Sequence, residues 1–321
     1  MTSAPTRRLH RRLLLITALG LVIALVGVGA IATDTLGAGH LFDRAVAKVD
    51  RVLAGPVPDR SAPDTVLVTD PPEDAADLDP DEAPIATPVV GAAGPGITPV
   101  PVPTASPTPT PTIPRVPITF DILADHKAVF AHELKVTWCA SAGVQMVLAT
   151  LHLGKTSDAF QREIQGRVRE WESYKDSHNG DWGPSAMALA LDAYGARGYE
   201  VHAYQTRQGA LRGAAKAIMK TNSPAILLAW RGAHTWVMTG FKADADPTVF
   251  ANAKIAGTYI QDPWYPDISS IWGPSDPPGT FQNNSEMIRN FLPWKRPEGK
   301  YPARDGLYIT VLPTIPVSAP G

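Results

Sequence analysis

The spacing of apolar residues changes along the chain and predicts a different kind of structure in successive parts. Residues 13–32 form an uncharged apolar run of 20 residues, and a helix of about 20 residues spans the hydrocarbon core of a bilayer. In residues 139–151, apolar side chains recur at intervals of three and four, which predicts a helix with one buried face. Helical patterns follow in three more segments, residues 157–171, 184–194 and 209–220.

After these helical segments the pattern becomes that of β-strands. Four segments rich in branched and aromatic residues are predicted strands, residues 225–230, 234–241, 258–262 and 306–312. Helices first and strands later favour an α+β domain, in which N-terminal helices pack on an antiparallel sheet, over a regular βαβ array. The predicted domain covers residues 118–315, which is long enough for one substantial core. Residues 316–321 are expected to form a flexible tail.

Positive charge next to the apolar run predicts how the chain meets a membrane. Four arginines lie within residues 1–12, immediately before the run. We therefore expect this basic tail in the cytoplasm and everything after the run outside the cytoplasmic membrane. The length of the run favours a single transmembrane signal anchor over residues 13–32. The alternative is a cleaved signal peptide and a secreted protein, because Ala-Ile-Ala at residues 30–32 has the small-x-small form of a cleavage site.

Residues 33–117 lack the pattern of a folded domain. An amphipathic stretch at residues 41–53 is expected to lie near the membrane, residues 69–82 are acidic without one basic residue, and residues 98–117 are dominated by proline. Such sequence buries too little apolar surface to fold and favours extended polyproline II structure. We expect a disordered linker that holds the domain away from the membrane. The formal net charge of -2 gives no reason to expect a nucleic-acid partner.

The chain contains one cysteine, Cys139, so it cannot form the intramolecular disulfide that exported proteins often use. With Thr137 as the N-cap, the sulfur lies in the first turn of the helix. There the unpaired backbone N–H groups and the helix dipole stabilise a thiolate. The alternatives are a buried and inert thiol, because free cysteine is among the most buried residue types, and a link to another molecule.

A histidine and an aspartate lie at the ends of two predicted strands. His234 opens an apolar strand whose alternation places Met238 on the face of His234 and Phe241 on the opposite face. If this strand pairs antiparallel with the strand that ends at Asp262, the two polar residues become neighbours, although 28 positions separate them. A thiol, an imidazole and a carboxylate that orients the imidazole are the groups that thiol activation requires. A hydrogen-bonded rim histidine and an Asp-Pro turn are the structural alternatives.

Three blocks of the sequence, WCASAGVQMVL, GAHTWVMTGF and YIQDPW, resemble the cysteine, histidine and aspartate blocks of papain-like cysteine peptidases. They are most similar to the bacteriocin-processing (family 39) peptidases and their single-domain extracellular relatives, over about residues 120–312. The resemblance implies a papain-like fold, with Cys139 as the nucleophile, His234 as general base and acid, and Asp262 as the orienting residue. It also implies a peptide or protein substrate, cleaved through a thioester acyl-enzyme.

The chain departs from that family at the oxyanion hole. The backbone N–H of Cys139 is one candidate donor, but the family's glutamine six positions earlier is replaced by Glu133, with His132 beside it. A carboxylate donates no hydrogen bond unless it is protonated, and one missing donor costs about a hundred- to a thousandfold in rate. The candidate residues of the substrate cleft are three tryptophans, Trp138, Trp182 and Trp264.

Motifs that the sequence lacks restrict the chemistry further. The sequence has no paired Cys/His zinc spacing, no H-E-x-x-H, no G-x-S-x-G and no glycine loop for phosphate, so no metal and no cofactor are expected. The leading hypothesis is an extracytoplasmic thiol hydrolase that cleaves peptide or amide bonds. A weak or inactive papain-fold module that binds a peptide or a cell-surface polymer stays open, as does a transglutaminase-type acyltransferase. Cell-wall peptidases with a cysteine nucleophile usually carry Asp-Cys-Ser, which is missing here.

Overall fold

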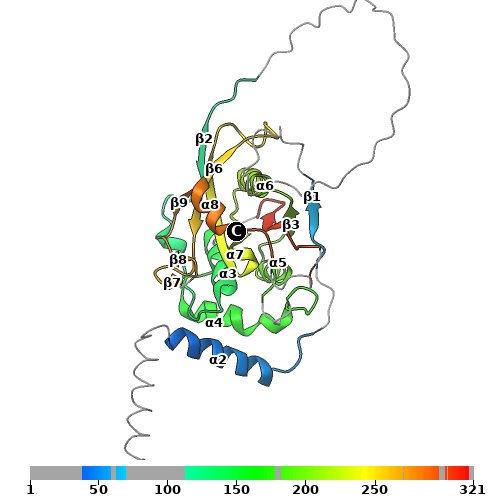
Figure 1. Cartoon of the computed structure of the whole chain (residues 1–321), viewed down its shortest axis with the longest axis vertical. Helices are drawn as coiled ribbons and strands as arrows, with labels where there is room; N and C mark the ends of the chain where they lie inside the picture. The colour runs from blue at the N-terminus through cyan, green and yellow to red at the C-terminus, as the bar shows by residue number, and fades with distance from the viewer. Residues whose placement is uncertain are drawn as a thin grey trace, which may run out of the picture.

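The computed structural model describes residues 38–58, 63–69, 113–177, 182–269, 271–295, 301 and 303–317 (Figure 1). The predicted basic tail and membrane segment, residues 1–12 and 13–32, lie outside this part of the chain, and so does most of the acidic and proline-rich linker. Within the described ranges, no helix combines the length and the apolar character that crossing a bilayer requires.

The predicted helices are present, with one broken in two. Residues 139–151, 184–194 and 209–220 correspond to α3 (Cys139–Thr150), α5 (Pro184–Ala193) and α6 (Arg207–Thr221). The pattern over residues 157–171 ends earlier, since α4 (Asp158–Gly166) is followed by a separate 3-10 turn, η4 (Val168–Glu170). The described residues also contain α2 (Ala38–Leu53), η3 (Lys127–Val129), α7 (Ala229–Gly232) and α8 (Asn284–Asn290).

Local chemistry explains where two of these helices begin and end. Pro184 occupies the first turn of α5, where its missing N–H has no intrahelical partner to lose. Thr206 caps α6, because its hydroxyl oxygen accepts from the Gly209 N–H at 2.9 Å. Asn222 ends α6 in the left-handed conformation that asparagine tolerates.

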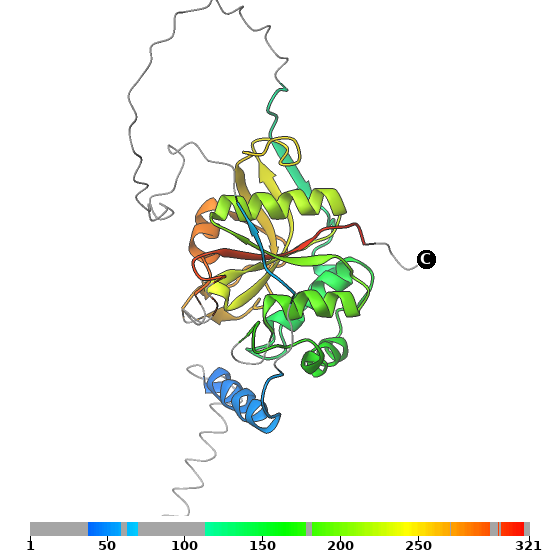
Figure 2. The same cartoon turned by 90° about the vertical axis from the view of Figure 1, so that its right-hand side faces the viewer.

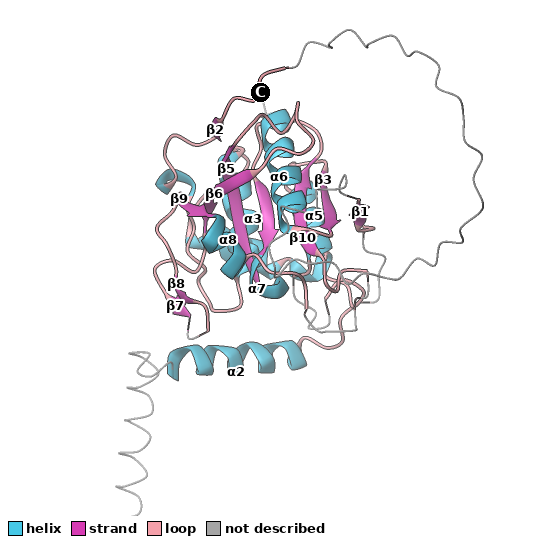
Figure 3. Cartoon of the chain, turned by 45° about the horizontal axis from the view of Figure 1, so that its top comes forward, coloured by secondary structure: helices cyan, strands magenta, loops and turns pink. Residues whose placement is uncertain are grey.

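The centre of the domain is an eight-stranded sheet (Figure 3). Its strands lie in the order β1-β3-β10-β4-β5-β6-β9, and β2 pairs with β5. The bounds are β1 Val66–Val68, β2 Ile118–Asp121, β3 Tyr199–Tyr204, β4 Ala225–Leu228, β5 His234–Ala243, β6 Ile255–Gln261, β9 Thr280–Asn283 and β10 Tyr308–Pro313. A separate two-stranded ribbon joins β7 (Ile268–Ser269) to β8 (Gly273–Pro274).

Helices cover both faces of this sheet, so the domain has two cores. Figure 2 shows α6 on one face and α3 with α5 on the other. Val144 of α3 and Leu191 of α5 pack in the same core as Val237 of β5. Leu211 of α6 shares the second core with Met238 of β5. The protein is therefore a mixed α+β domain, as the element order predicts, and every strand pair of the large sheet except β1–β3 is antiparallel.

One detail of the predicted alternation on β5 is wrong. Phe241 lies in the same core as Met238, not on the opposite face. The cause is an irregularity in the pairing of β5 with β6 between Met238 and Gly240, where the register shifts. An extra residue in one strand reverses the side on which all later side chains point.

The segment before residue 118, which the sequence predicts as a linker, contributes to the domain at several points. Strand β1 pairs in parallel with β3 and forms one edge of the sheet. The guanidinium of Arg169 donates to the carbonyl oxygens of Gly55 and Pro56 at 3.0 and 2.9 Å. Part of the predicted 33–117 segment therefore packs on the folded domain.

Candidate active site

The position of Cys139 is fixed by the packing of one helix on one strand. Cys139 is the first residue of α3, so its sulfur lies in the first turn, as expected. The predicted cap is wrong, because the N-cap is Trp138, not Thr137, and no side chain caps this end. A Cβ on Gly143 would lie 2.4 Å from the Thr235 side chain. The missing side chain at Gly143 therefore lets α3 approach β5 and brings the sulfur to the histidine.

The position of His234 depends on an unusual turn. Two consecutive residues of α7, Trp230 and Arg231, have positive φ angles of 52° and 62°, which are uncommon for residues other than glycine. The turn places the Trp230 indole parallel to the His234 ring, with centroids 4.0 Å apart. The indole N–H of Trp230 donates to Asn290 of α8 at 3.2 Å. Strained residues at a turn are a reason to look for function there.

Asp262 follows β6 and lies where the sequence predicts it. Strands β5 and β6 pair antiparallel, with Val237 opposite Gln261, so the start of one strand meets the end of the other. His234 Nε2 lies 2.7 Å from Asp262 Oδ1, and both side chains are almost fully buried. The same oxygen accepts from the Trp264 N–H at 2.9 Å. Because Nε2 is bound to Asp262, Nδ1 is the ring nitrogen left for the thiol.

The three groups influence each other's protonation. Burial alone would raise the pKa of the Cys139 thiol, but the hydrogen bond and charge of His234, with hydrogen bonds from Thr235, lower that pKa below its usual value. Burial opposes protonation of His234, but the charge and hydrogen bond of Asp262, together with Cys139, raise the pKa of His234 to about 10. Both shifts favour a thiolate beside an imidazolium, which is the reactive form of such a pair.

Glu133 lies in the same cluster. Its side chain and those of Cys139 and His234 each offer one ligating atom, and these three atoms lie within 4.8 Å of one another. Glu133 is 2 % exposed, and neither carboxyl oxygen has a hydrogen-bond partner among the described residues. Burial raises the pKa of Glu133 well above its usual value, the charges of Cys139, Asp262 and Asp267 raise it further, and only His234 opposes them.

The loop that carries Glu133 is held on two sides. The Glu133 N–H donates to the Pro263 carbonyl oxygen at 2.9 Å, directly after Asp262. On the other side, the buried Gln161 amide accepts from the Leu134 N–H and donates to the His132 carbonyl oxygen, both at 2.8 Å. These backbone contacts fix the loop from its two ends, so the carboxyl of Glu133 has a defined place beside the sulfur.

Four other residues are expected at the site, and the structure shows the contacts of each: His132, Trp138, Trp182 and Trp264. His132 is not part of the three-atom cluster, and its Nδ1 donates to the Tyr265 carbonyl oxygen at 2.9 Å. Trp264 lies edge-on to His234, with centroids 6.3 Å apart. Trp138 precedes Cys139, and the Lys135 ammonium lies 5.3 Å from its ring centroid. Trp182 packs on Trp171, and its indole N–H donates to Gln165.

Sequence reasoning missed two aromatic residues of the site. Trp230 covers one face of His234, and Trp272 stacks on Trp230 with centroids 5.7 Å apart. Trp230 is the last residue of the predicted strand at residues 225–230, and a bulky residue beside the turn before His234 was the available signal. Trp272 belongs to the segment between β7 and β8, and the aromatic, turn-rich sequence that follows Asp262 was the available signal.

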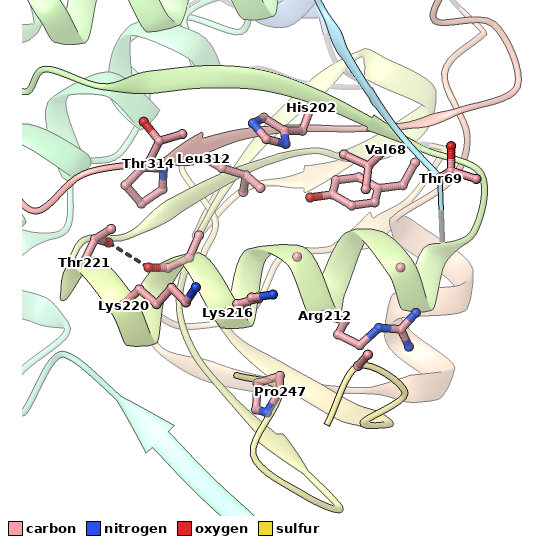
Figure 4. Close-up of a pocket in the computed structure, with 16 residues that line it drawn as sticks. Val68, Thr69, His202, Arg212, Lys216, Lys220, Thr221, Pro247, Leu312 and Thr314 are labelled. Atoms are coloured by element: carbon pink, nitrogen blue, oxygen red, sulfur yellow. Dashed lines mark hydrogen bonds between the residues drawn. The ribbon is translucent and has the colours of Figure 1, made fainter. Parts of the chain in front are cut away.

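A cavity of about 440 Å³ lies away from this cluster (Figure 4). It is lined by α6, including Arg212, Lys216 and Lys220, and by residues of β3 and β10, including His202 and Leu312. Neither the cysteine, nor the histidine, nor the aspartate of the cluster lines it. The reactive groups therefore lie at the ends of strands β5 and β6, and the cavity is a separate feature of the α6 face.

Fold and site together define a mixed α+β protein with a buried histidine–aspartate pair beside a partly exposed cysteine.

No protein-family model and no curated protein matches the chain. Among solved structures it is similar to a double-glycine motif protease from an AMS/PCAT transporter, solved in complex with the leader peptide. That match has 19% sequence identity and a TM-score of 0.29, and covers 58% of this chain and 91% of the other. A TM-score this low carries no argument, so the functional inference rests on the site.

Proposed function

We propose that the protein is an extracytoplasmic thiol hydrolase of the papain-like cysteine peptidase type, which cleaves peptide or amide bonds. The observation that carries this proposal is the cluster itself. Three residue types that thiol catalysis needs come from α3, β5 and the end of β6, and they meet at one place. As a whole residue, Cys139 is neither fully buried nor fully exposed.

In the proposed reaction the Cys139 thiolate attacks the carbonyl carbon of the scissile bond. The C–N bond then breaks, and His234 gives its proton to the departing amine nitrogen. The acyl group remains on sulfur as a thioester. Water attacks the thioester carbonyl while His234 accepts a proton, and the acid product leaves with the thiolate restored. Asp262 holds the imidazole in one orientation throughout.

Two hydrogen-bond donors are proposed for the negative oxygen that develops in this reaction. One is the backbone N–H of Cys139, at the start of α3. For the second, Glu133 is better placed than His132, because Glu133 lies beside the sulfur and the His132 ring binds Tyr265. A Glu133 carboxyl donates only as the neutral acid, so a Glu133→Gln variant, which always carries an N–H donor, is expected to hydrolyse substrate at least as fast as the native protein.

Alkylation by iodoacetamide tests the activation of the thiol. With metal removed by a chelator, Cys139 in the native protein is expected to react faster at neutral pH than a free thiol. A His234→Ala variant is expected to lose this excess. Equal rates in the two proteins would overturn the proposal. Hydrolysis of a broad peptide library, lost in Cys139→Ala, would extend it from a reactive thiol to an enzyme.

A binding module is the second candidate, and Glu133 is the observation that favours it. A negative carboxylate beside the sulfur would repel the oxyanion instead of stabilising it. A peptide would then bind without being cleaved. The library experiment separates the two functions, since a module retains peptides that are recovered intact, whereas a hydrolase releases shortened products.

A further inference from the structure

Three different ligand types converge at the candidate active site. Glu133 supplies a carboxylate oxygen, Cys139 a sulfur and His234 a ring nitrogen, all within 4.8 Å of one another. Zinc accepts this combination of ligands, whereas magnesium and calcium prefer oxygen alone. Three protein ligands and an open fourth position are the arrangement of zinc sites that also bind water or a small molecule.

A second observation concerns the atoms around these ligands. His234 Nε2 is bound to Asp262 Oδ1 at 2.7 Å, which leaves Nδ1 toward the cluster. A histidine that binds a metal almost always donates its other ring N–H to a carboxylate or carbonyl oxygen, which fixes the ring and makes it more basic. Asp262 is therefore suited to support His234 as a metal ligand as well as a base.

The third observation is the burial of the Glu133 carboxyl. Its carboxyl is 2 % exposed, and both oxygens are without a hydrogen bond within the described part of the chain. Burying a carboxyl without a hydrogen bond is unfavourable, and a suitable partner would remove that cost. A divalent cation between Glu133, Cys139 and His234 would supply that partner.

We propose that Glu133, Cys139 and His234 form a binding site for a zinc ion, with Asp262 as the outer support of the histidine. Zinc–ligand bonds of about 2.0–2.3 Å place the ligand atoms about 3.5 Å apart. The three ligand atoms now lie within 4.8 Å of one another. Zinc binding therefore requires a side-chain movement of about 1 Å. The backbone around Glu133 is held by Gln161 and Pro263, so rotation of the Glu133 side chain supplies this movement.

Zinc binding leaves the three-ligand site without net charge. The zinc ion takes up the thiolate, the neutral Nδ1 and the carboxylate, and every proton that those groups carried is released to solvent. No electron is transferred. The sulfur lone pair that would attack a carbonyl is then held by the metal. Zinc therefore silences the thiol reversibly, and removing zinc restores it. The metal site does not depend on the proposed hydrolase activity, because it needs only the ligands.

Cobalt titration of the full-length chain tests the site independently of catalysis. The protein is reduced with a phosphine, freed of metal with a chelator and titrated with Co²⁺, followed by Zn²⁺ competition. The expected result is one Co²⁺ per chain, with a thiolate-to-cobalt charge-transfer band and strong visible bands of tetrahedral cobalt. Cys139→Ser is expected to abolish the charge-transfer band. A native protein without this band, or a band that survives in Cys139→Ser, overturns the proposal.

A pair of acidic variants isolates the third ligand. Glu133→Gln removes a ligand and is expected to weaken Zn²⁺ binding by about a hundredfold or more, and Asp262→Asn by about ten- to a hundredfold. Asp267→Asn is the matched control, because Asp267 also acts on the charge of Glu133 but is not one of the ligands. It is expected to change the affinity less than about threefold. Equal affinity of native protein and Glu133→Gln would overturn the three-ligand site.

The two proposals fail in different ways. If chelated protein cleaves no peptide but binds cobalt through sulfur, the hydrolase proposal fails and the metal site stands. If chelated protein cleaves peptides and gives no cobalt band, the reverse holds. If both stand, Zn²⁺ is expected to suppress both peptide cleavage and iodoacetamide alkylation of native protein, with Glu133→Gln about a hundredfold less sensitive. Circular dichroism of each metal-free variant checks that the fold is retained.

Discussion

The two sides of the candidate active site are built in different ways. The cysteine side is regular, since Cys139 begins a helix whose following residues, from Ala140 to Ala149, are buried. The histidine side is irregular, because His234 follows two residues with positive φ angles, Trp230 and Arg231, and its partner Asp262 lies in a turn after β6. One side therefore positions its group by packing, and the other by strained backbone, aromatic stacking and hydrogen bonds.

This difference indicates which kind of substitution would displace the sulfur and which would displace the imidazole. The sulfur keeps its place as long as α3 fits against β5, so added volume in that contact should displace it. The imidazole keeps its place as long as particular contacts persist, and loss of one partner should matter more than a change of volume there. Four substitution experiments test this contrast, beginning with the largest expected effect.

The largest effect should come from removing the reacting group on either side. Cys139→Ser and His234→Ala are each expected to lower kcat/KM of metal-free protein by about 10⁴-fold, and the double variant by no more than either alone. Groups that act as one unit are non-additive in this way. Peptide hydrolysis in chelator measures it, with His202→Gln as a control histidine that lines the separate cavity. A double variant that loses the product of both factors would show two independent groups.

The contact between α3 and β5 should give the next largest effect. A Cβ on Gly143 would lie 2.4 Å from Thr235 Cγ2, so Gly143→Ala is expected to lower the free energy of unfolding by about 3 kcal/mol. Gly166 is the control, since it is also a glycine within a helix, the last residue of α4, and nothing lies within 4 Å of an added Cβ. Gly166→Ala is expected to stabilise by up to about 1 kcal/mol. Denaturant unfolding measures both, and equal changes would contradict close packing at Gly143.

The cysteine side was the easier one to predict from sequence. The spacing of apolar residues along α3 is a local signal, and it located the helix and its first turn correctly. The mixed α+β class and the meeting of His234 with Asp262 also followed from element order and antiparallel pairing. The cap was wrong because Trp138, a residue without a capping side chain, takes the position.

The histidine side contains what the sequence could not predict. The positive φ angles of Trp230 and Arg231 have no local sequence signal, because neither residue favours that conformation. The shift of register after Met238 moved Phe241 to the other core, and such irregularities depend on the neighbouring strand. Strand β1 was missed for a similar reason, since its exposed residues gain structure only by pairing with β3. These features depend on contacts between distant segments.

A third, smaller effect should come from the loop that joins the two sides. Gln161→Leu leaves the Leu134 N–H and the His132 carbonyl oxygen without their buried partner, at a cost of about 2 kcal/mol in the free energy of unfolding. Because Glu133 lies between them, kcat should fall as well. Gln208 of α6 binds both backbone groups of Ile255 in the same way, far along the chain from this loop. Gln208→Leu is expected to lower stability and to leave kcat unchanged, and a loss of kcat there would contradict a local role for Gln161.

The smallest effect should come from the strained turn itself, where strain and contact can be separated. Arg231 is exposed and has a φ of 62°, so Arg231→Gly removes a left-handed penalty of about 1–2 kcal/mol and adds about 0.5–1 kcal/mol of unfolded-state entropy. The net expectation is a gain of about 0.5 kcal/mol in the free energy of unfolding, measured with denaturant, with peptide hydrolysis unchanged.

Trp230→Gly relieves similar strain but removes the ring stacked on His234, so it should lower both stability and kcat. If Arg231→Gly lowers kcat as strongly as Trp230→Gly, the imidazole is aimed by the backbone conformation of the turn and not by the indole that covers it.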